Sequence, residues 1–154
     1  MSSWFSRFLK CAEIDDEDSG LGPKHPSFAA HFRDPIYDDP ADDLAPFGND
    51  EGWDLLADWA ERADELHSDS TLTQLAPEWF RGRPLLPADL NEHDVDVNDI
   101  VIAAGFTLLR LTGQIGEPDR ALVLRALDIR DRTHGHEPQT QQMRADLLAF
   151  GRTR

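Results

Sequence analysis

The sequence has little of what several protein classes require. Among its 154 residues there is one cysteine, Cys11, so no internal disulfide can form and a disulfide-built secreted scaffold is excluded. No stretch approaches the roughly 20 consecutive apolar residues of a membrane-spanning helix. The apolar residues near the N-terminus are too few and too interrupted to form the hydrophobic part of a signal peptide. These absences predict a cytoplasmic protein.

The motifs of the common catalytic sites are also missing. The chain contains no His-Glu-x-x-His zinc motif, no Gly-x-Ser-x-Gly nucleophile elbow and no glycine-rich phosphate loop. An EF-hand loop starting at Asp94 fails, because its sixth and twelfth positions are Asp99 and Gly105 instead of Gly and Glu. Cys11 would lie at the end of a short helix, where the helix dipole disfavours a thiolate. We therefore predict no catalytic residue and no cofactor.

Basic residues are scarce as well. The chain has 15 Lys and Arg against 30 Asp and Glu, which gives a formal net charge of −15. The excess is uneven, since residues 1–100 hold 24 acids and 7 bases, whereas residues 101–154 hold 6 acids and 8 bases. A field of this sign repels nucleic-acid phosphates and anionic membranes. It attracts a basic protein partner, although a high net charge also serves solubility alone.

What the sequence does contain is helical periodicity. It predicts an all-α fold, a compact bundle of four to five helices in a single domain that covers residues 1–154. Residues 1–12 are predicted to form a short amphipathic helix. Residues 13–48 are acidic and rich in proline, which indicates an irregular segment that apolar side chains hold against the domain. Residues 49–150 are predicted to form the helical core.

Four longer helices are expected within this core. The helix of residues 96–111 is apolar on nearly all sides, so it should be the central, buried one. Capping residues and the apolar spacing predict that the first helix begins at Asn49 or Asp50 and ends near Leu66. The three later helices are predicted to begin at Asp96 or Asn98, at Pro118 and at Pro138. Ser70 is expected to cap a short turn that continues to Leu75.

The helix that begins near Asn49 has an apolar face and an opposite face that is strongly negative. Trp53 and Trp59 are six positions apart, so they lie on different sides of the helix, and Trp53 is the better candidate for a partly exposed side chain. The alternative that both tryptophans belong to the core stays open. The residues predicted to contact a basic protein partner are Asp38, Asp39, Asp42, Asp43, Trp53, Asp54, Asp58, Glu61 and Glu65.

Two other readings of the sequence remain. The first is a metal-dependent hydrolase or metal-binding domain, because imidazole and carboxylate groups that bind metals gather in the proline-rich segment: His25, His31, Asp34, Asp38 and Asp39. The second is a homodimer that forms through an apolar patch on the N-terminal helix: Trp4, Phe5 and Phe8.

One stretch resembles a known group of proteins. It precedes and opens the first long helix and reads Ala45-Pro46-Phe47-Gly48-Asn49-Asp50-Glu51-Gly52-Trp53-Asp54-Leu55-Leu56. Together with His25-Pro26 and the acidic lead-in, it resembles small uncharacterised bacterial proteins of the YfeS type over about residues 23–66. The resemblance implies a small helical bacterial domain without an established activity, and it carries over no catalytic residue. In physical terms, Gly48 and Gly52 would permit a close backbone approach at the helix entry.

The acidic composition also suggests a class of function. Small acidic cytoplasmic bacterial proteins of this kind are similar in character to immunity proteins, which neutralise a cognate toxin that is often a basic nuclease. We therefore expect a non-enzymatic binding protein, most simply an immunity-type inhibitor that acts by protein–protein contact. The metal-dependent hydrolase is the alternative.

Overall fold

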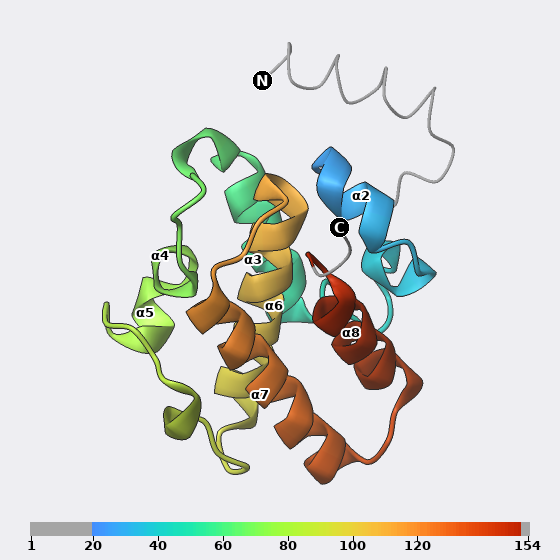
Figure 1. The fold of residues 1–154 in the computed structure, drawn as a ribbon, viewed down its shortest axis with the longest axis vertical. Helices are drawn as coiled ribbons and strands as arrows, with labels where there is room; N and C mark the ends of the chain where they lie inside the picture. Colours follow the sequence, from blue (N-terminus) through green and yellow to red (C-terminus); the bar gives the residue numbers. More distant parts are fainter. Residues whose placement is uncertain (1–19, 152–154) are drawn as a thin grey trace.

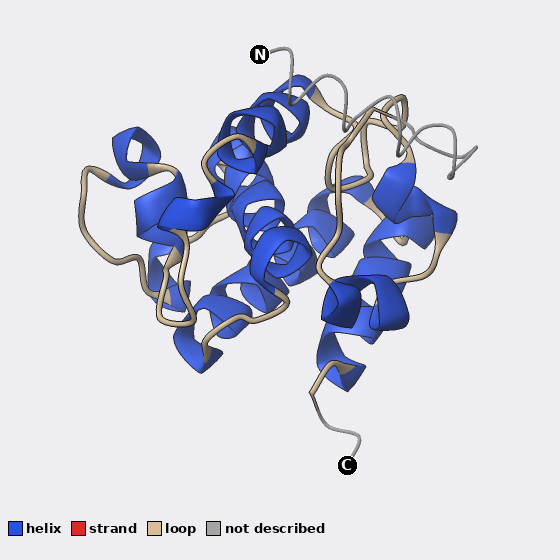
Figure 2. Ribbon diagram, turned by 90° about the horizontal axis from the view of Figure 1, so that it is seen from above, coloured by secondary structure: helices blue, strands red, loops and turns tan. Residues whose placement is uncertain are grey.

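A long central helix organises the computed structural model, which describes residues 20–151. The described residues contain no strand, which confirms the all-α prediction (Figure 2). The α-helices are α2 (Pro26–His31), α3 (Asp50–Ala60), α4 (Leu72–Leu75), α5 (Pro77–Phe80), α6 (Val95–Thr112), α7 (Glu117–His134) and α8 (Pro138–Ala149). Three 3₁₀ turns join them: η1 (Pro35–Asp38), η2 (Ala63–Glu65) and η3 (Pro87–Asp89).

Helix α6 is the centre of the core, as its all-round apolar sequence predicts. Every residue from Ile100 to Arg110 is buried. Helices α3 and α7 pack against α6, and α8 packs against α7 (Figure 1). The approach of α7 is close at Gly105, where an added Cβ would lie 2.3 Å from Cγ2 of Val123. The central position of α6 therefore fixes α3 on one side and the α7–α8 pair on the other.

From residue 20 to residue 48, the proline-rich segment is more ordered than the sequence predicts. It contains α2 and η1, each of which begins with a proline that follows a capping side chain, His25 for α2 and Asp34 for η1. Its aromatic side chains belong to the core rather than to a surface loop: Phe28, Phe32, Tyr37 and Phe47 are at most 1% exposed. Pro26 and Pro35 begin helical turns rather than mark loops, and the aromatic rings are buried because they pack against α6, a contact that the local sequence pattern does not predict.

One buried arginine attaches this segment to the central helix. Arg110, near the end of α6, donates hydrogen bonds from Nη1 to the carbonyl of Tyr37 (2.9 Å) and from Nη2 to the carbonyl of Gly22 (2.9 Å). The same Nη1 lies 3.1 Å from Oδ1 of Asp38. Burial of a guanidinium is tolerated because backbone carbonyls and a carboxylate replace water around it.

Three details of the predicted helices are wrong. The first long helix ends at Ala60 rather than near Leu66, because Arg62 donates its backbone N–H to the carbonyl of Trp59 and the chain tightens into 3₁₀ turns. The cap of α4 is Thr71 rather than Ser70. Helix α6 begins after Asp94, so Asp96 is in its first turn and Asn98 is buried inside it.

The entry of α3 agrees with the sequence. Asn49 is the cap, and its Oδ1 accepts a hydrogen bond of 2.7 Å from the backbone N–H of Gly52. A Cβ at Gly48 would lie 1.8 Å from the carbonyl oxygen of Asp42, and one at Gly52 would lie 2.2 Å from that of Pro46. Both glycines are thus required by close backbone contacts, as the sequence of this stretch suggests.

Several features of the sequence lie outside the described residues. Cys11 and the predicted N-terminal helix with Trp4, Phe5 and Phe8 precede residue 20, so the predictions about them lie outside the described residues. Across residues 20–151, none of the helices combines the length and the apolar character needed to cross a bilayer.

Candidate functional site

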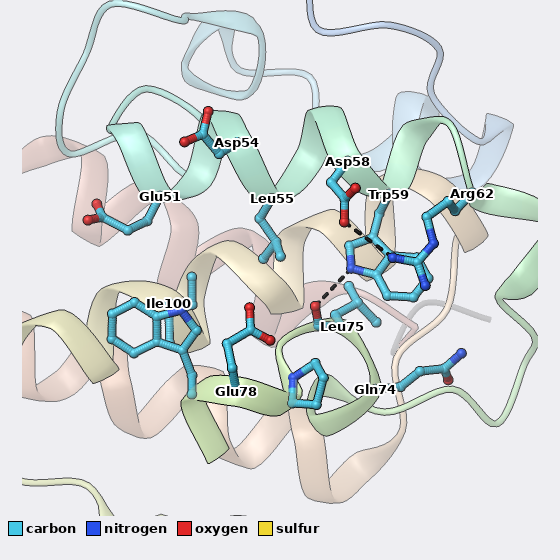
Figure 3. A pocket seen from close by; sticks show the side chains of 12 residues that line it. Glu51, Asp54, Leu55, Asp58, Trp59, Arg62, Gln74, Leu75, Glu78 and Ile100 are labelled. Atoms are coloured by element: carbon cyan, nitrogen blue, oxygen red, sulfur yellow. Dashed lines mark hydrogen bonds and ion pairs between the residues drawn. The ribbon is translucent and has the colours of Figure 1, made fainter. Parts of the chain in front are cut away.

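A groove of about 410 Å³ lies between α3 on one side and α4 and α5 on the other (Figure 3). Its lining combines an apolar floor with an acidic rim. The floor and walls include Leu55, Trp59, Leu75, Pro77, Trp79 and Ile100, and the rim carries Glu51, Asp54, Asp58, Glu78, Arg62 and Gln74. Four carboxylates thus line the rim of an apolar surface, and the guanidinium of Arg62 lies at one end of it.

Helix α3 supplies one side of the groove through its periodicity. Leu56 and Trp59 are buried, which fixes the rotation of the helix on the core. Residues Glu51, Leu55 and Asp58, spaced by three and four positions, then lie along the groove side. Figure 3 shows Leu55 pointing from α3 into the space between the elements, with Asp54 at the rim and turned away from α5.

A buried hydrogen bond sets the position of the opposite side. The indole Nε1 of Trp59 donates to the carbonyl of Leu75 at the end of α4, at 2.8 Å. Pro77 then begins α5, which Arg81 ends in the left-handed conformation (φ 54°). The short α5 directs the carboxylate of Glu78 toward α3 (Figure 3). The groove therefore has a fixed wall on each side, because Trp59 links α3 to α4.

Arg62 occupies one end of the groove. Its guanidinium carbon lies 4.0 Å from the centre of the Trp59 ring, a cation–π contact. Nε and Nη2 donate to the two carboxylate oxygens of Glu65 (3.2 and 3.1 Å), and Nη1 lies 3.3 Å from Oδ2 of Asp58. The hydrogen bonds from Arg62 lower the pKa of Glu65. At this end of the groove the protein thus supplies its own cation, which both carboxylates share.

The other end carries the same kinds of side chain without such a partner. Trp79 is 37% exposed, and Glu51 and Glu78 are exposed beside the groove. Within residues 20–151, the carboxylates of Glu51, Asp54 and Glu78 make no hydrogen bond or ion pair. Negative charge and an accessible indole are therefore available to a ligand at this end.

The residues predicted to bind a partner separate into two groups. Asp54 and Asp58 line the groove and Glu65 borders it through Arg62, whereas Glu61 is exposed outside the lining. Trp53 is 37% exposed, so the alternative that both tryptophans belong to the core is wrong, and Trp53 lies beside Gly20 on another side of α3.

The four loop carboxylates are not part of the groove. Asp38 is paired with Arg110 and also with Lys24 at 2.7 Å. The carboxylate of Asp42 accepts hydrogen bonds from the backbone N–H of Leu44 (3.0 Å) and from Nε2 of Gln139 on α8 (2.8 Å). Asp39 caps the turn at Ala41, and Asp43 is exposed nearby. These residues thus lie beside the end of α6 and beside α8.

The histidines of the metal-site alternative make structural contacts. Nδ1 of His25 accepts the backbone N–H of Ser27 as the cap of α2 (3.1 Å). Nε2 of His31 is 2.7 Å from the carbonyl of Asp146, so this nitrogen carries the proton and donates. Among residues 20–151, no group of three or more His, Cys, Asp and Glu is arranged to hold a metal ion. The structure therefore gives the metal alternative no support.

Sequence reasoning missed two important groove residues, Glu78 and Trp79. The signal available was Pro77, which starts a helical turn and leaves the following polar and aromatic side chains on its outer side. That signal does not show that α5 faces α3, because the contact depends on the hydrogen bond between Trp59 and Leu75.

Comparison with known proteins adds one partial relative. The chain is 47% identical over 51 residues to the uncharacterized protein YfeS of Escherichia coli (strain K12). The matched region is 32% of this chain and 21% of that protein, so the match spans about a fifth of the relative's length. The likeness to YfeS predicted from the sequence is thus confirmed for this region. No family model matches the chain, and no solved structure matches it.

Proposed function

We propose that this chain is a cytoplasmic, non-enzymatic binding protein that recognises a basic surface of another protein through the groove between α3 and α5. The observation that carries the proposal is that Glu51 and Glu78 line the groove without an ion-pair partner within residues 20–151, beside an apolar floor and the exposed indole of Trp79. Complementary charge speeds the encounter with a basic partner, and a partly exposed tryptophan is a common anchor of protein interfaces.

The chemistry of the lining favours binding over covalent catalysis. The groove residues include no histidine, cysteine, serine or lysine among those that the structure describes. Ser–His and Cys–His nucleophile–base pairs are therefore not formed in the groove, and its possible nucleophiles and bases are carboxylates. A groove of carboxylates, apolar groups and indole rings instead suits a long basic side chain, whose stem is apolar and whose end is charged.

The immunity-type role is a specific form of this proposal. A toxin that cleaves nucleic acid carries Lys and Arg around its site, because it has to bind phosphates. An acidic protein that covers those residues would block the site without any chemistry of its own. The net charge of −15 supports this role.

Charge reversal at the groove tests the proposal. The double variant Glu51→Lys/Glu78→Lys reverses two groove carboxylates. The control Asp69→Lys/Glu92→Lys reverses two exposed carboxylates outside the groove and changes the net charge equally. Proteins retained from a lysate of the source bacterium by each immobilised variant would be compared, and a retained basic protein would then be purified and its activity measured with and without the native chain.

The expected result is a basic protein that the native chain and the control variant bind and inhibit, and that the groove variant binds at least about tenfold more weakly. Its affinity should fall as salt rises, because the paired charges are screened. Equal loss of binding in both double variants would show that total charge, rather than the groove, attracts the partner. A partner that binds both variants as tightly as the native chain would refute the proposal.

A further inference from the structure

The groove is lined by indole rings and carboxylates, but an internal cation, Arg62, lies at only one of its ends. At one end, the indole of Trp59 and the carboxylates of Asp58 and Glu65 surround the guanidinium of Arg62. Away from Arg62, Figure 3 shows the carboxylates of Glu51 on α3 and Glu78 on α5, and the indole of Trp79 also lines the groove. The protein itself thus shows which cation fits an indole and two carboxylates on this surface.

Resting on the function proposed above, we propose that the open end of the groove is an arginine-binding subsite. It takes one arginine side chain of the basic partner, with the guanidinium against the indole of Trp79 and between the carboxylates of Glu51 and Glu78. The apolar floor at Leu55 and Ile100 receives the methylene stem of that arginine.

The shape and the surface of the groove favour this occupant. Its volume of about 410 Å³ is near the lower limit of small-ligand sites, roughly 300–1,000 Å³, so it suits single side chains rather than a whole helix. Its apolar floor excludes water from the stem of a long side chain but would leave a short one without contact. The four rim carboxylates exceed the one internal cation, Arg62, so a second positive charge is favourable.

Arginine is favoured over lysine for a physical reason. A guanidinium is planar, so it stacks on an indole face while its edge N–H groups donate to carboxylates on both sides. An ammonium group is a compact and strongly hydrated charge, and it loses more hydration when it enters an apolar groove. Charge alone would attract both side chains equally. A preference for arginine would therefore show that stacking on Trp79 and hydrogen bonds to the carboxylates contribute to binding.

Two peptides of equal charge test the proposal on the full chain. Hexa-arginine and hexa-lysine would be titrated into the protein at near-physiological salt, with binding followed by the indole N–H signals in two-dimensional NMR. The variant Trp79→Ala removes the indole of the groove, and Trp53→Ala is a matched control, because both tryptophans are 37% exposed and Trp53 lies outside the groove. Trp79→Leu keeps apolar bulk and separates stacking from packing.

The proposal expects hexa-arginine to bind about three- to fivefold more tightly than hexa-lysine, the effect of one exposed cation–π contact. The preference should disappear in Trp79→Ala and Trp79→Leu and persist in Trp53→Ala, and the indole signal of Trp79 should shift most. Equal affinities for the two peptides, or a preference that Trp79→Ala retains, would overturn the arginine subsite.

The same titration distinguishes this failure from a failure of the proposed function. In one outcome both peptides bind equally, and Glu51→Lys/Glu78→Lys weakens their binding more than Asp69→Lys/Glu92→Lys does. This outcome overturns the arginine preference but still supports a groove that binds basic ligands. Binding that both double variants weaken equally, or no binding of either peptide at low salt, overturns the groove and the subsite together. Far-UV circular dichroism of each variant verifies that the fold is intact.

Discussion

Tyr37 allows a direct test of how the N-terminal segment is held in the core. It is the single tyrosine of the chain, and its side chain is fully buried. Its O–H donates to Oδ2 of Asp146 on α8, at 2.8 Å. Burial first, and then the hydrogen bond and the charge of Asp146, raise the pKa of Tyr37 well above its ordinary value. The folded protein therefore keeps this phenol protonated at a pH where the unfolded chain ionises it.

The sign and size of the effect follow from this difference. Because the pKa of Tyr37 is higher in the folded state, its contribution to stability is complete below about pH 10 and is lost as the pH rises beyond that value. The free energy of unfolding should then fall by up to about 1.4 kcal/mol per pH unit from this group. Tyr37→Phe abolishes that slope, and it removes a hydrogen bond to a charged acceptor, a loss of about 1–2 kcal/mol at neutral pH.

The two stability curves should therefore converge and meet roughly one pH unit above pH 10. Urea unfolding followed by tryptophan fluorescence gives both curves, and the near-ultraviolet absorbance of tyrosinate shows when Tyr37 ionises. Parallel curves would refute the reasoning, as would tyrosinate that forms near pH 10 while far-UV circular dichroism still reports intact helices.

Three further predictions concern the capping and packing of the helices. Burial raises the pKa of Asp119, although the backbone N–H of Leu72 opposes this, so its ionisation reduces stability as the pH rises above about 4. Asp119→Asn should therefore become progressively more stable than the native chain in urea unfolding as the pH rises above about 4; a constant difference would contradict this. Gly105→Ala should cost about 1–3 kcal/mol through its clash with Val123. Adding Val123→Ala should recover part of that loss in a double-mutant cycle, and strict additivity would show that the contact is relaxed. Asn49→Ala should lower the midpoint of thermal unfolding by removing the cap of α3, at about 1 kcal/mol, whereas Asn49→Asp should retain most of the stability.

The helices that could be predicted from the sequence are those whose own residues determine them. The all-round apolar character of α6 predicted its central burial, and Pro118 and Pro138 correctly marked the starts of α7 and α8. The end of α3 shows where the method fails. Leu66 continues the apolar spacing and is indeed buried, but the backbone has left the helix by then. The apolar spacing therefore predicted the burial of Leu66 correctly, but it predicted a helical backbone there incorrectly.

The candidate site was predictable only in the part that one helix supplies. The stripe with Asp54 and Asp58 follows from the spacing along α3. Glu78 lies across the groove because a hydrogen bond joins Trp59 to Leu75, which are 16 residues apart. The pairing of Asp38 with Arg110 joins residues still further apart in the chain. Neither contact is visible in the local sequence pattern. The sequence therefore could not show that the acidic residues of α3 line the groove whereas those at positions 38–43 lie elsewhere.

The distribution of arginines explains why a net charge of −15 leaves a localised site. Two buried arginines of the C-terminal helices pair with acids of the first part of the chain: Arg110 with Asp38, and Arg130 with Asp99 at 2.6 Å. These pairs are structural, because each guanidinium also binds a backbone carbonyl of the N-terminal segment. No C-terminal arginine lines the groove within residues 20–151, and Arg62 lies at only one of its ends. Within the described residues, the carboxylates of Glu51 and Glu78 therefore have no arginine beside them, because the fold places its buried arginines elsewhere; the function proposed above has a basic partner supply that cation.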